Sequence, residues 1–447
     1  MSLSCGSQVQ GELKWWQLSL LGVGCTIGTG YFLGSSIAIK YTGPSVLIAF
    51  LLAACGTFIV FEALAKMSAK DPQEGSFRSY AKKAHGRWAG FSSGWVYWSS
   101  EMMIMGSQLT ALSIFTRFWF PHLPLWVFAS IYAVLGIVAV AIGTKGFERL
   151  ENIFAVIKVA AIFMFIILAC LAVFGFLDDG AKEGLPNGLS GFFPKGAIGL
   201  WGALLYAFYA FGGIEVMGIM TMRLKDKKDA AKAGAVMLLL LVSIYVISLA
   251  LVIYMVPFQV LHENESPFVT ALETYKLPFF PHVFNGAMII AGFSTMAASF
   301  FSVTKMIITL SKEGDAPALF SKQKSKKMEF PLPAILLTTC GLIISIVLSL
   351  LLPGKIYEYI TTAAGLMLLY NWFFILISRQ KLLKLSVGDK IKQIVGMILI
   401  VLAVSGTLLH SSSRPGFYVS IGFLLIIALV ILKLRPQWKK EEKEATH

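Results

Sequence analysis

Four side chains that could bind a proton or a polar ligand stand inside long apolar stretches of the sequence: Glu101, Gln108, Lys158 and Glu215. A lysine at the centre of a membrane span costs about 2.5–3.5 kcal/mol on insertion scales, and polar or ionisable residues there are rare. Each of these four residues is therefore a functional candidate. No apolar segment shows a Ser/His, paired-aspartate or HExxH arrangement that would activate a nucleophile or hold a metal. The chemistry to expect is therefore ligand binding and proton transfer, not an enzymatic reaction.

Two glycine-rich stretches offer a second kind of polar group, the main chain. GVGCTIGTG (22–30) and YAFYAFGGIEVMG (206–218) each put glycines at the middle of an apolar segment. Inside a bilayer each unpaired backbone group costs several kcal/mol, so helix breaks survive only inside protein or along a cavity. We interpret both stretches as broken membrane helices. A half-helix after such a break points free N–H groups and a positive dipole end at an anion such as a carboxylate.

Two other interpretations of residues 22–30 compete with a break. Gly24 with Gly28, and Gly30 with Gly34, are GxxxG pairs, which allow close packing of neighbouring helices. A nucleotide-binding loop would need a strand before it and a soluble βαβ unit around it. The second break, in the sixth apolar segment, favours a transporter, because spans one and six are equivalent in an inverted repeat of five helices.

The composition indicates an all-helical integral membrane protein: 57% of the 447 residues are hydrophobic, 14% are charged and the mean hydropathy is +0.74. Segments of about 20 apolar residues, long enough to cross the hydrocarbon, predict twelve transmembrane helices. Their approximate limits are 17–37, 44–65, 90–113, 126–143, 152–176, 196–219, 234–256, 283–309, 332–352, 356–378, 391–409 and 416–434. With the N-terminus inside, 29 lysines and arginines face the cytoplasm and 7 face outward, so both termini are predicted to be cytoplasmic.

The net charge of +14 does not predict a nucleic-acid partner. Basic residues gather in short loops such as 223–232 and 322–329, where they suit the anionic headgroups of the lipid bilayer. The longest loops have only about 20–25 residues, so residues 1–447 are predicted to form a single domain. The five cysteines have no CxxC spacing and the six histidines fall outside the spans, so we expect no metal and no cofactor.

Four stretches together resemble the amino acid–polyamine–organocation superfamily, and within it the bacterial amino-acid transporter family. They are IGTGYFLGS (27–35), DPQEGSFRSYAKKAHGRWAGFSSGW (71–95), FGGIE (211–215) and KEGDAP (312–317). The second of these is a long and specific pattern in the loop after the second span, and the likeness extends from the first span to about the tenth.

The resemblance implies a fold like that of the sodium-coupled leucine transporter. Two inverted five-helix repeats, about 17–176 and 196–378, with discontinuous helices 1 and 6, would be followed by two extra helices at about 391–434.

The resemblance also implies the substrate-binding residues. Gly28, Thr29 and Gly30 would bind the α-carboxylate of an amino acid, main-chain carbonyls around Thr26, Tyr209 and Gly212 would bind its amino group, and Phe211 stands in the same second break. Tyr209 could be an aromatic gate over the substrate or an ordinary packing residue.

Lys158, about a third of the way into the fifth span, resembles the lysine that replaces a sodium ion in proton-coupled members of the superfamily. Desolvation favours its neutral form, so we expect a proton to be the coupling ion. Snorkelling to the cytoplasmic interface is the alternative, and for Lys305 it is the preferred one.

Glu101 and Gln108 are seven residues apart and share a helix face that the family turns toward the pocket. Glu62 and Lys66 suit a structural ion pair at i, i+4.

Two departures from the family pattern weaken the case for a basic substrate. Gln108 stands where members commonly carry a glutamate, and Arg223 where they carry an acidic residue. The expectation is a permease of the bacterial inner membrane that imports a neutral, aliphatic or small L-amino acid with a proton by alternating access. A proton-independent exchanger and a non-transporting amino-acid sensor are the alternatives. The sequence predicts neither the particular amino acid nor the oligomeric state.

Overall fold

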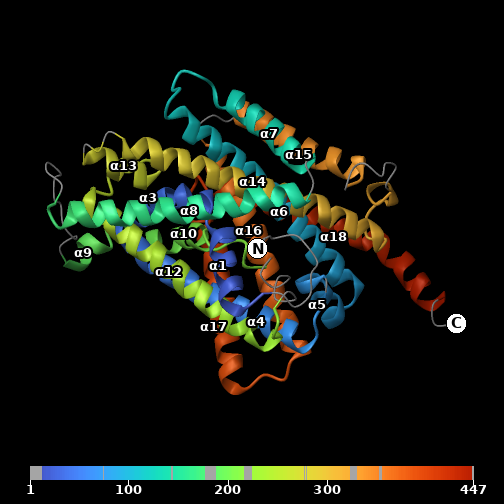
Figure 1. Ribbon diagram of the computed structural model, residues 1–447. Helices are drawn as coiled ribbons and strands as arrows, with labels where there is room; N and C mark the ends of the chain where they lie inside the picture. Colours follow the sequence, from blue (N-terminus) through green and yellow to red (C-terminus); the bar gives the residue numbers. More distant parts are fainter. Residues whose placement is uncertain are drawn as a thin grey trace.

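Helices make up almost all of the described chain (Figure 1). The computed structural model describes residues 13–73, 75–141, 144–176, 188–215, 224–275, 277, 279–322, 330–351 and 355–444. Within these ranges no β-strand is formed, and an isolated bridge joins Leu13 to Leu224. The side chains of residues 141–150, 152, 439 and 442–444 are outside the description.

The helices of the apolar segments differ in length, from four residues in α2 to 33 in α14. They are α1 (Trp15–Thr26), α2 (Thr29–Phe32), α3 (Gly34–Thr42), α4 (Val46–Lys70), α6 (Arg87–Arg117), α7 (Leu125–Ala141), α8 (Thr144–Val173), α10 (Gly196–Tyr209), α12 (Ala230–Met255), α14 (Phe280–Lys312), α15 (Leu332–Leu351), α16 (Ile356–Leu382), α17 (Val387–Gly406) and α18 (Arg414–Glu444). Short helices lie in the connections: α5 (Ser76–His85), α9 (Gly188–Phe192) and α13 (Pro267–Thr274), with 3-10 turns at Gly43–Ser45, Lys227–Asp229 and Ala318–Phe320.

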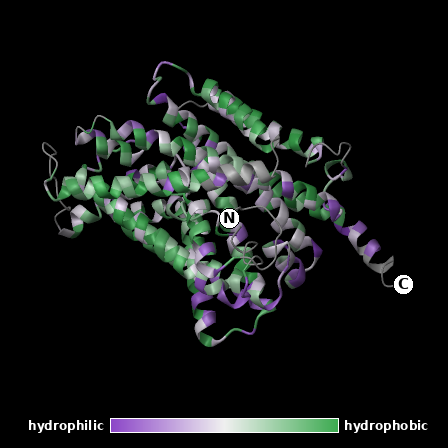
Figure 2. Ribbon diagram, viewed as in Figure 1, coloured by the Kyte–Doolittle hydropathy of each residue, from purple (hydrophilic) through white to green (hydrophobic). Residues whose placement is uncertain are grey.

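Seven helical stretches of the described chain are long and apolar enough to cross a membrane. They are Thr29–Lys70, Ile153–Val173, Lys227–Met255, Phe280–Lys312, Leu332–Leu351, Ile356–Leu382 and Arg414–Trp438. The outer helices also expose large apolar side chains, such as Leu429 of α18 and Val134 of α7, which a soluble protein would bury. In Figure 2 the helices are mainly green, and most purple residues lie around the lower ends of α4, α5 and α17 and along the C-terminal part of α18, with a few in the upper loops. The protein is therefore an all-helical membrane protein.

Helix α6 lies at the centre of the bundle, between α14 and α16. Aromatic rings fix α2 beside this centre: Tyr31 stacks on Tyr245 of α12, with ring centroids 4.0 Å apart, and lies 5.1 Å from the ring of Phe268 in α13. Helices α7 and α15 pack against each other at one edge (Figure 1). The short segment α2 is therefore held by contacts with other elements, although four residues alone cannot sustain a helix.

The ion pair predicted between Glu62 and Lys66 is present, with 2.9 Å between Oε1 and Nζ. It belongs to a larger group, since Lys66 also lies 2.8 Å from Asp389 and Arg379 lies 2.7 Å from the same carboxylate. Hydrogen bonds from Lys66 and Ser386 hold the pKa of Asp389 below its ordinary value. These charges join the end of α4 to the end of α16 and the start of α17.

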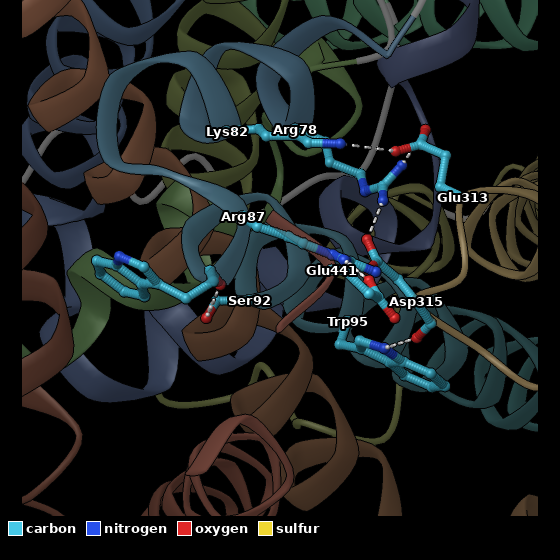
Figure 3. Close-up of polar contacts among 9 residues, drawn as sticks. Arg78, Lys82, Arg87, Ser92, Trp95, Glu313, Asp315 and Glu441 are labelled. Carbon is cyan, nitrogen blue, oxygen red and sulfur yellow. Dashed lines mark hydrogen bonds and ion pairs between the residues drawn. The ribbon is translucent and has the colours of Figure 1, made fainter. Parts of the chain in front are cut away.

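Two of the motif stretches, 71–95 and 312–317, meet in an ion-pair cluster around the buried Arg78 and Asp315 (Figure 3). Arg78 of α5 is 3% exposed and donates to Glu313 and to Asp315, at 2.6 Å in each case. Arg87, at the start of α6, lies 3.4 Å from the other oxygen of Asp315. The loop before α6 is thereby fixed to the loop after α14.

Candidate helix-break site

The first predicted break is present between α1 and α2. Helix α1 ends at Thr26, Ile27 and Gly28 adopt extended conformations, and α2 begins at Thr29. Glycine is needed at position 28 because a Cβ there would lie 2.9 Å from Cγ2 of Thr295. The chain therefore leaves the helical conformation inside the bundle, where protein groups replace water around the exposed main chain.

The second predicted break follows α10. Helix α10 ends at Tyr209, residues 210–213 form turns, and helical conformation resumes at Ile214. Gly213 has φ +105°, in the left-handed region that side chains with a Cβ rarely adopt. The second glycine of this pair thus has a conformational reason. The segment beyond Glu215, residues 216–223 with Arg223, lies outside the described residues.

The two breaks lie against each other. A Cβ on Gly30 would come within 2.9 Å of the Tyr209 ring, and one on Gly213 would lie 3.8 Å from the carbonyl oxygen of Cys25. Close packing explains Gly24 as well, since its Cβ would be 3.0 Å from that of Ala155 on α8, whereas Gly34 has only a Tyr357 hydroxyl at 3.7 Å. Within 22–34, Gly24 therefore serves close helix packing, whereas Gly28 and Gly30 belong to the helix break.

Gln108 of α6 contacts the main chain of the first break. The Thr29 N–H donates to Oε1 of Gln108 at 3.4 Å, and the Thr29 hydroxyl donates to the same oxygen. The Thr29 carbonyl accepts a hydrogen bond of 3.1 Å from Tyr357. Thr26 instead bonds the carbonyl of Gly22 in its own helix, at 2.9 Å. The side-chain oxygen of Gln108 thus lies where the resemblance implies an oxygen of the substrate's α-carboxylate.

The residues of the second break differ in their surroundings. Tyr209 is buried between the breaks, and its hydroxyl lies 3.0 Å from that of Ser107. Phe211 is fully buried in the apolar core, with its ring 5.2 Å from that of Tyr245, apart from these polar groups. A Cβ on Gly212 would lie 3.1 Å from Leu368 and from the Tyr209 carbonyl.

Two buried carboxylates flank the breaks. Glu215 is fully buried and accepts hydrogen bonds of 3.2 Å from the N–H of Gly213 and from the Trp372 indole. It therefore stabilises the second break directly. Glu101 is buried beside Tyr97 and beside Ser299 of α14, about two turns away from Gln108 on the same helix.

Lys158 lies fully buried in α8, and its ammonium donates to the carbonyl of Gly24 at 3.2 Å. Glu151, seven residues earlier in the same helix, is 3.6 Å from the ammonium. The lysine thus contacts the first interrupted helix from a fully buried position, whereas Lys305 is exposed. Sequence reasoning missed Glu151, although its i, i+7 spacing from Lys158 places both on one helix face.

A bundle with two facing helix breaks and buried ionisable side chains is typical of secondary transporters. The chain belongs to the amino acid permease family of the amino acid–polyamine–organocation superfamily, whose family model, "Amino acid permease", matches residues 17–392. Its relatives carry the names of transporters and permeases, so it is a transport protein and not an enzyme.

Three relatives illustrate the likeness. The chain is 56% identical over its whole length to "Uncharacterized transporter YcgH" of Bacillus subtilis, which it covers completely. It is 31% identical to "Aromatic amino acid transport protein AroP" of Corynebacterium glutamicum, over 92% of this chain and 93% of that one. It is 26% identical to "Gamma-aminobutyric acid permease" of Escherichia coli, over 97% and 96%.

Proposed function

We propose that this protein imports a neutral, aliphatic or small L-amino acid together with a proton, by alternating access, across a bacterial plasma membrane with both termini in the cytoplasm. We further propose that its helices form twelve spans, in two inverted repeats of five (17–176 and 196–378) and two extra helices (391–434), as one domain. The positions of the two breaks support this arrangement, because they fall in the first helix of each proposed repeat.

The observation that carries the proposal is the contact between Thr29 and Gln108. The N–H and hydroxyl of Thr29 both donate to one oxygen, which is how a break would bind one oxygen of a substrate carboxylate. In the bound state the substrate carboxylate replaces Oε1 of Gln108 and contacts Gly28, Thr29 and Gly30. Its ammonium binds carbonyls near Thr26, Tyr209 and Gly212. Main-chain dipoles suit a zwitterion, because a fixed buried charge would carry a large desolvation cost.

A neutral substrate side chain agrees with the polar groups beside the breaks. Gln108, Ser107 and the Tyr209 hydroxyl are uncharged, and the carboxylate of Glu215 already accepts hydrogen bonds from protein groups. One relative, 32% identical over 81% of this chain, is "Probable threonine/serine transporter YbxG" of Bacillus subtilis. The names of the relatives refer to aromatic amino acids, threonine or serine, and γ-aminobutyric acid, none of which carries a net charge, and the uncharged Gln108 agrees with a substrate of that kind.

Proton coupling rests on Lys158. Its ammonium contacts Gly24 of α1, the helix that must move if the pocket is to open to one side and then the other. We propose that Lys158 is charged while it holds α1 and neutral when α1 has moved away. The coupling ion is then a proton and not a bound metal ion.

The test is uptake of labelled amino acids into vesicles that contain the purified protein. A gradient of one pH unit is worth about 1.4 kcal/mol per proton and should drive about tenfold accumulation. Lys158→Gln is expected to remove this accumulation while exchange of labelled for unlabelled amino acid continues. Equal uptake with and without the gradient in the wild type would support an exchanger instead, and absence of any flux would support a sensor.

A further inference from the structure

We propose that Glu151 is the group that takes the proton from Lys158 and passes it to the cytoplasm. This inference rests on the proposed proton coupling and assigns a residue to its inward step. Glu151 lies in none of the motif stretches and just before the expected fifth span, and the folded chain shows its contact with Lys158.

The geometry makes Glu151 the ionic partner of Lys158. The glutamate is 4% exposed and the lysine fully buried, and Oε1 lies 3.6 Å from Nζ. The other carboxylate oxygen, Oε2, accepts a hydrogen bond of 2.7 Å from Ser294 of α14. Three helices therefore meet at this pair: α8 provides both charges, α1 the Gly24 carbonyl and α14 the Ser294 hydroxyl.

Movement of α1 affects the two contacts of the Lys158 ammonium differently. The Gly24 carbonyl belongs to a short interrupted helix, whereas Glu151 is in the same helix as Lys158 and is fixed to α14. A displacement of α1 removes the neutral acceptor and leaves the carboxylate in place. Glu151 is then the remaining acceptor for the proton.

No other described charge competes for this position. Helices α1 and α7 contain no charged residue, and Lys232 of α12 lies over the ring of Trp15, 4.1 Å away. On α14, His282 stacks on Trp119, and Lys305 and Lys312 lie at its exposed cytoplasmic end. The remaining neighbours on α8 belong to 141–150, whose side chains are outside the description.

The transfer balances without another reactant. An N–H bond of the Lys158 ammonium breaks and an O–H bond forms on Oε1 of Glu151, which leaves a neutral amine and a neutral acid. The O–H bond then breaks, the proton leaves to cytoplasmic water, and a carboxylate remains. Reprotonation of the amine from the outer side completes the cycle.

The position of Glu151 along α8 gives the proton its direction. Seven residues correspond to about 10 Å of helix, and Glu151 lies toward the N-terminal end of α8. The distribution of basic residues puts that end on the cytoplasmic side. Both charges are also costly to bury, and a buried ion pair rarely adds stability over apolar residues of similar size, so packing alone does not account for the pair.

The experiment compares Glu151→Gln with wild type, with Lys158→Gln and with Lys305→Gln as the matched control on an exposed lysine. Glutamine keeps the size of the side chain and a hydrogen bond to Ser294 but cannot carry the proton. Gradient-driven accumulation should fall from about tenfold per pH unit to the level without a gradient. Exchange should stay within about twofold of wild type, and Lys305→Gln should behave as wild type.

The pH profile separates a proton relay from a fixed counter-charge. A relay predicts a lower plateau of net uptake at every external pH in Glu151→Gln, and partial recovery of that plateau in Glu151→Asp. A fixed counter-charge predicts an unchanged plateau with a shifted midpoint, which would overturn the proposal. Should Glu151→Gln fail to fold, Glu151→Asp decides: a normal midpoint with a reduced plateau supports the relay, and a shifted midpoint with a full plateau overturns it.

The outcomes also separate this inference from the proposed function. Loss of gradient-driven uptake in Lys158→Gln but full retention in Glu151→Gln would mean that Lys158 releases its proton without Glu151, so the relay would be wrong and proton symport would stand. A wild-type protein that ignores the gradient would overturn proton symport itself.

Discussion

Gly30→Ala is expected to reduce the initial rate of amino-acid uptake by about tenfold or more. The added Cβ would lie 2.9 Å from Cδ1 and 3.0 Å from Cε1 of Tyr209, and 3.2 Å from the Tyr209 carbonyl. The carbonyl belongs to the second break, so the main chain must shift to relieve the contact. Overpacking of this kind costs typically about 1–3 kcal/mol, and each 1.4 kcal/mol of lost binding is a factor of ten.

Gly34→Ala is the matched control four residues later on the same side of the chain. Its Cβ would meet only the Tyr357 hydroxyl, at an ordinary contact distance of 3.7 Å, so uptake should stay close to wild type. Uptake is normalised to the folded protein in the membrane, measured by size-exclusion chromatography. Equal loss in both variants would favour the GxxxG interpretation, in which the two glycines serve one helix interface, over the helix break.

Arg78→Ala is expected to give the largest loss of stability. The guanidinium is 3% exposed and is the closest cation to the buried carboxylate of Asp315, while Arg87 lies farther away, at 3.4 Å (Figure 3). Removal of one partner of a buried pair leaves an uncompensated charge and costs about 3–5 kcal/mol. The remaining contact with Arg87 puts the expected loss near the lower figure. Thermal unfolding in detergent should show an apparent Tm lower by several degrees.

Lys82→Ala removes a cation from the same cluster without that cost. Lys82 is 3.7 Å from Glu313, and both side chains are more than a third exposed. Such a pair contributes about 0–1 kcal/mol. If Lys82→Ala lowers the Tm as much as Arg78→Ala, burial is not what makes the cluster important, and the loops before α6 and after α14 are held by other contacts.

The helix breaks could be predicted from the sequence because their cause is local. Glycines in the middle of an apolar segment weaken the helix there, and a bilayer tolerates the exposed main chain only inside protein. The chain departs from helix at 27–28 and 210–213, within the two glycine-rich stretches. The division between Gly24, which packs on α8, and Gly30, which packs on Tyr209, was not predictable. It depends on which helix lies opposite each glycine, and that is a property of the assembled bundle.

Side-chain directions were harder to predict for the same reason. Membrane helices are apolar on every face, so periodicity does not distinguish the pocket face from the core face. Phe211 lies in the aromatic core with Tyr245, and Thr26 bonds its own helix, although both stand beside residues of the breaks. Glu151 was missed because it precedes the expected fifth span at 152–176, whereas helix α8 begins earlier, at Thr144.

The most direct test of the central claim, that polar main chain at two facing breaks binds a zwitterion, is a ligand-induced shift in Tm. A ligand at a hundred times its Kd stabilises the folded state by about 2.7 kcal/mol. The L-amino acid that competes best for uptake should raise the Tm of the purified protein. The amine with the same side chain but no carboxylate, and the N-acetylated amino acid, should not. An equal shift with the amine would contradict the account, because the N–H groups at Thr29 and its neighbours would then have no carboxylate to bind.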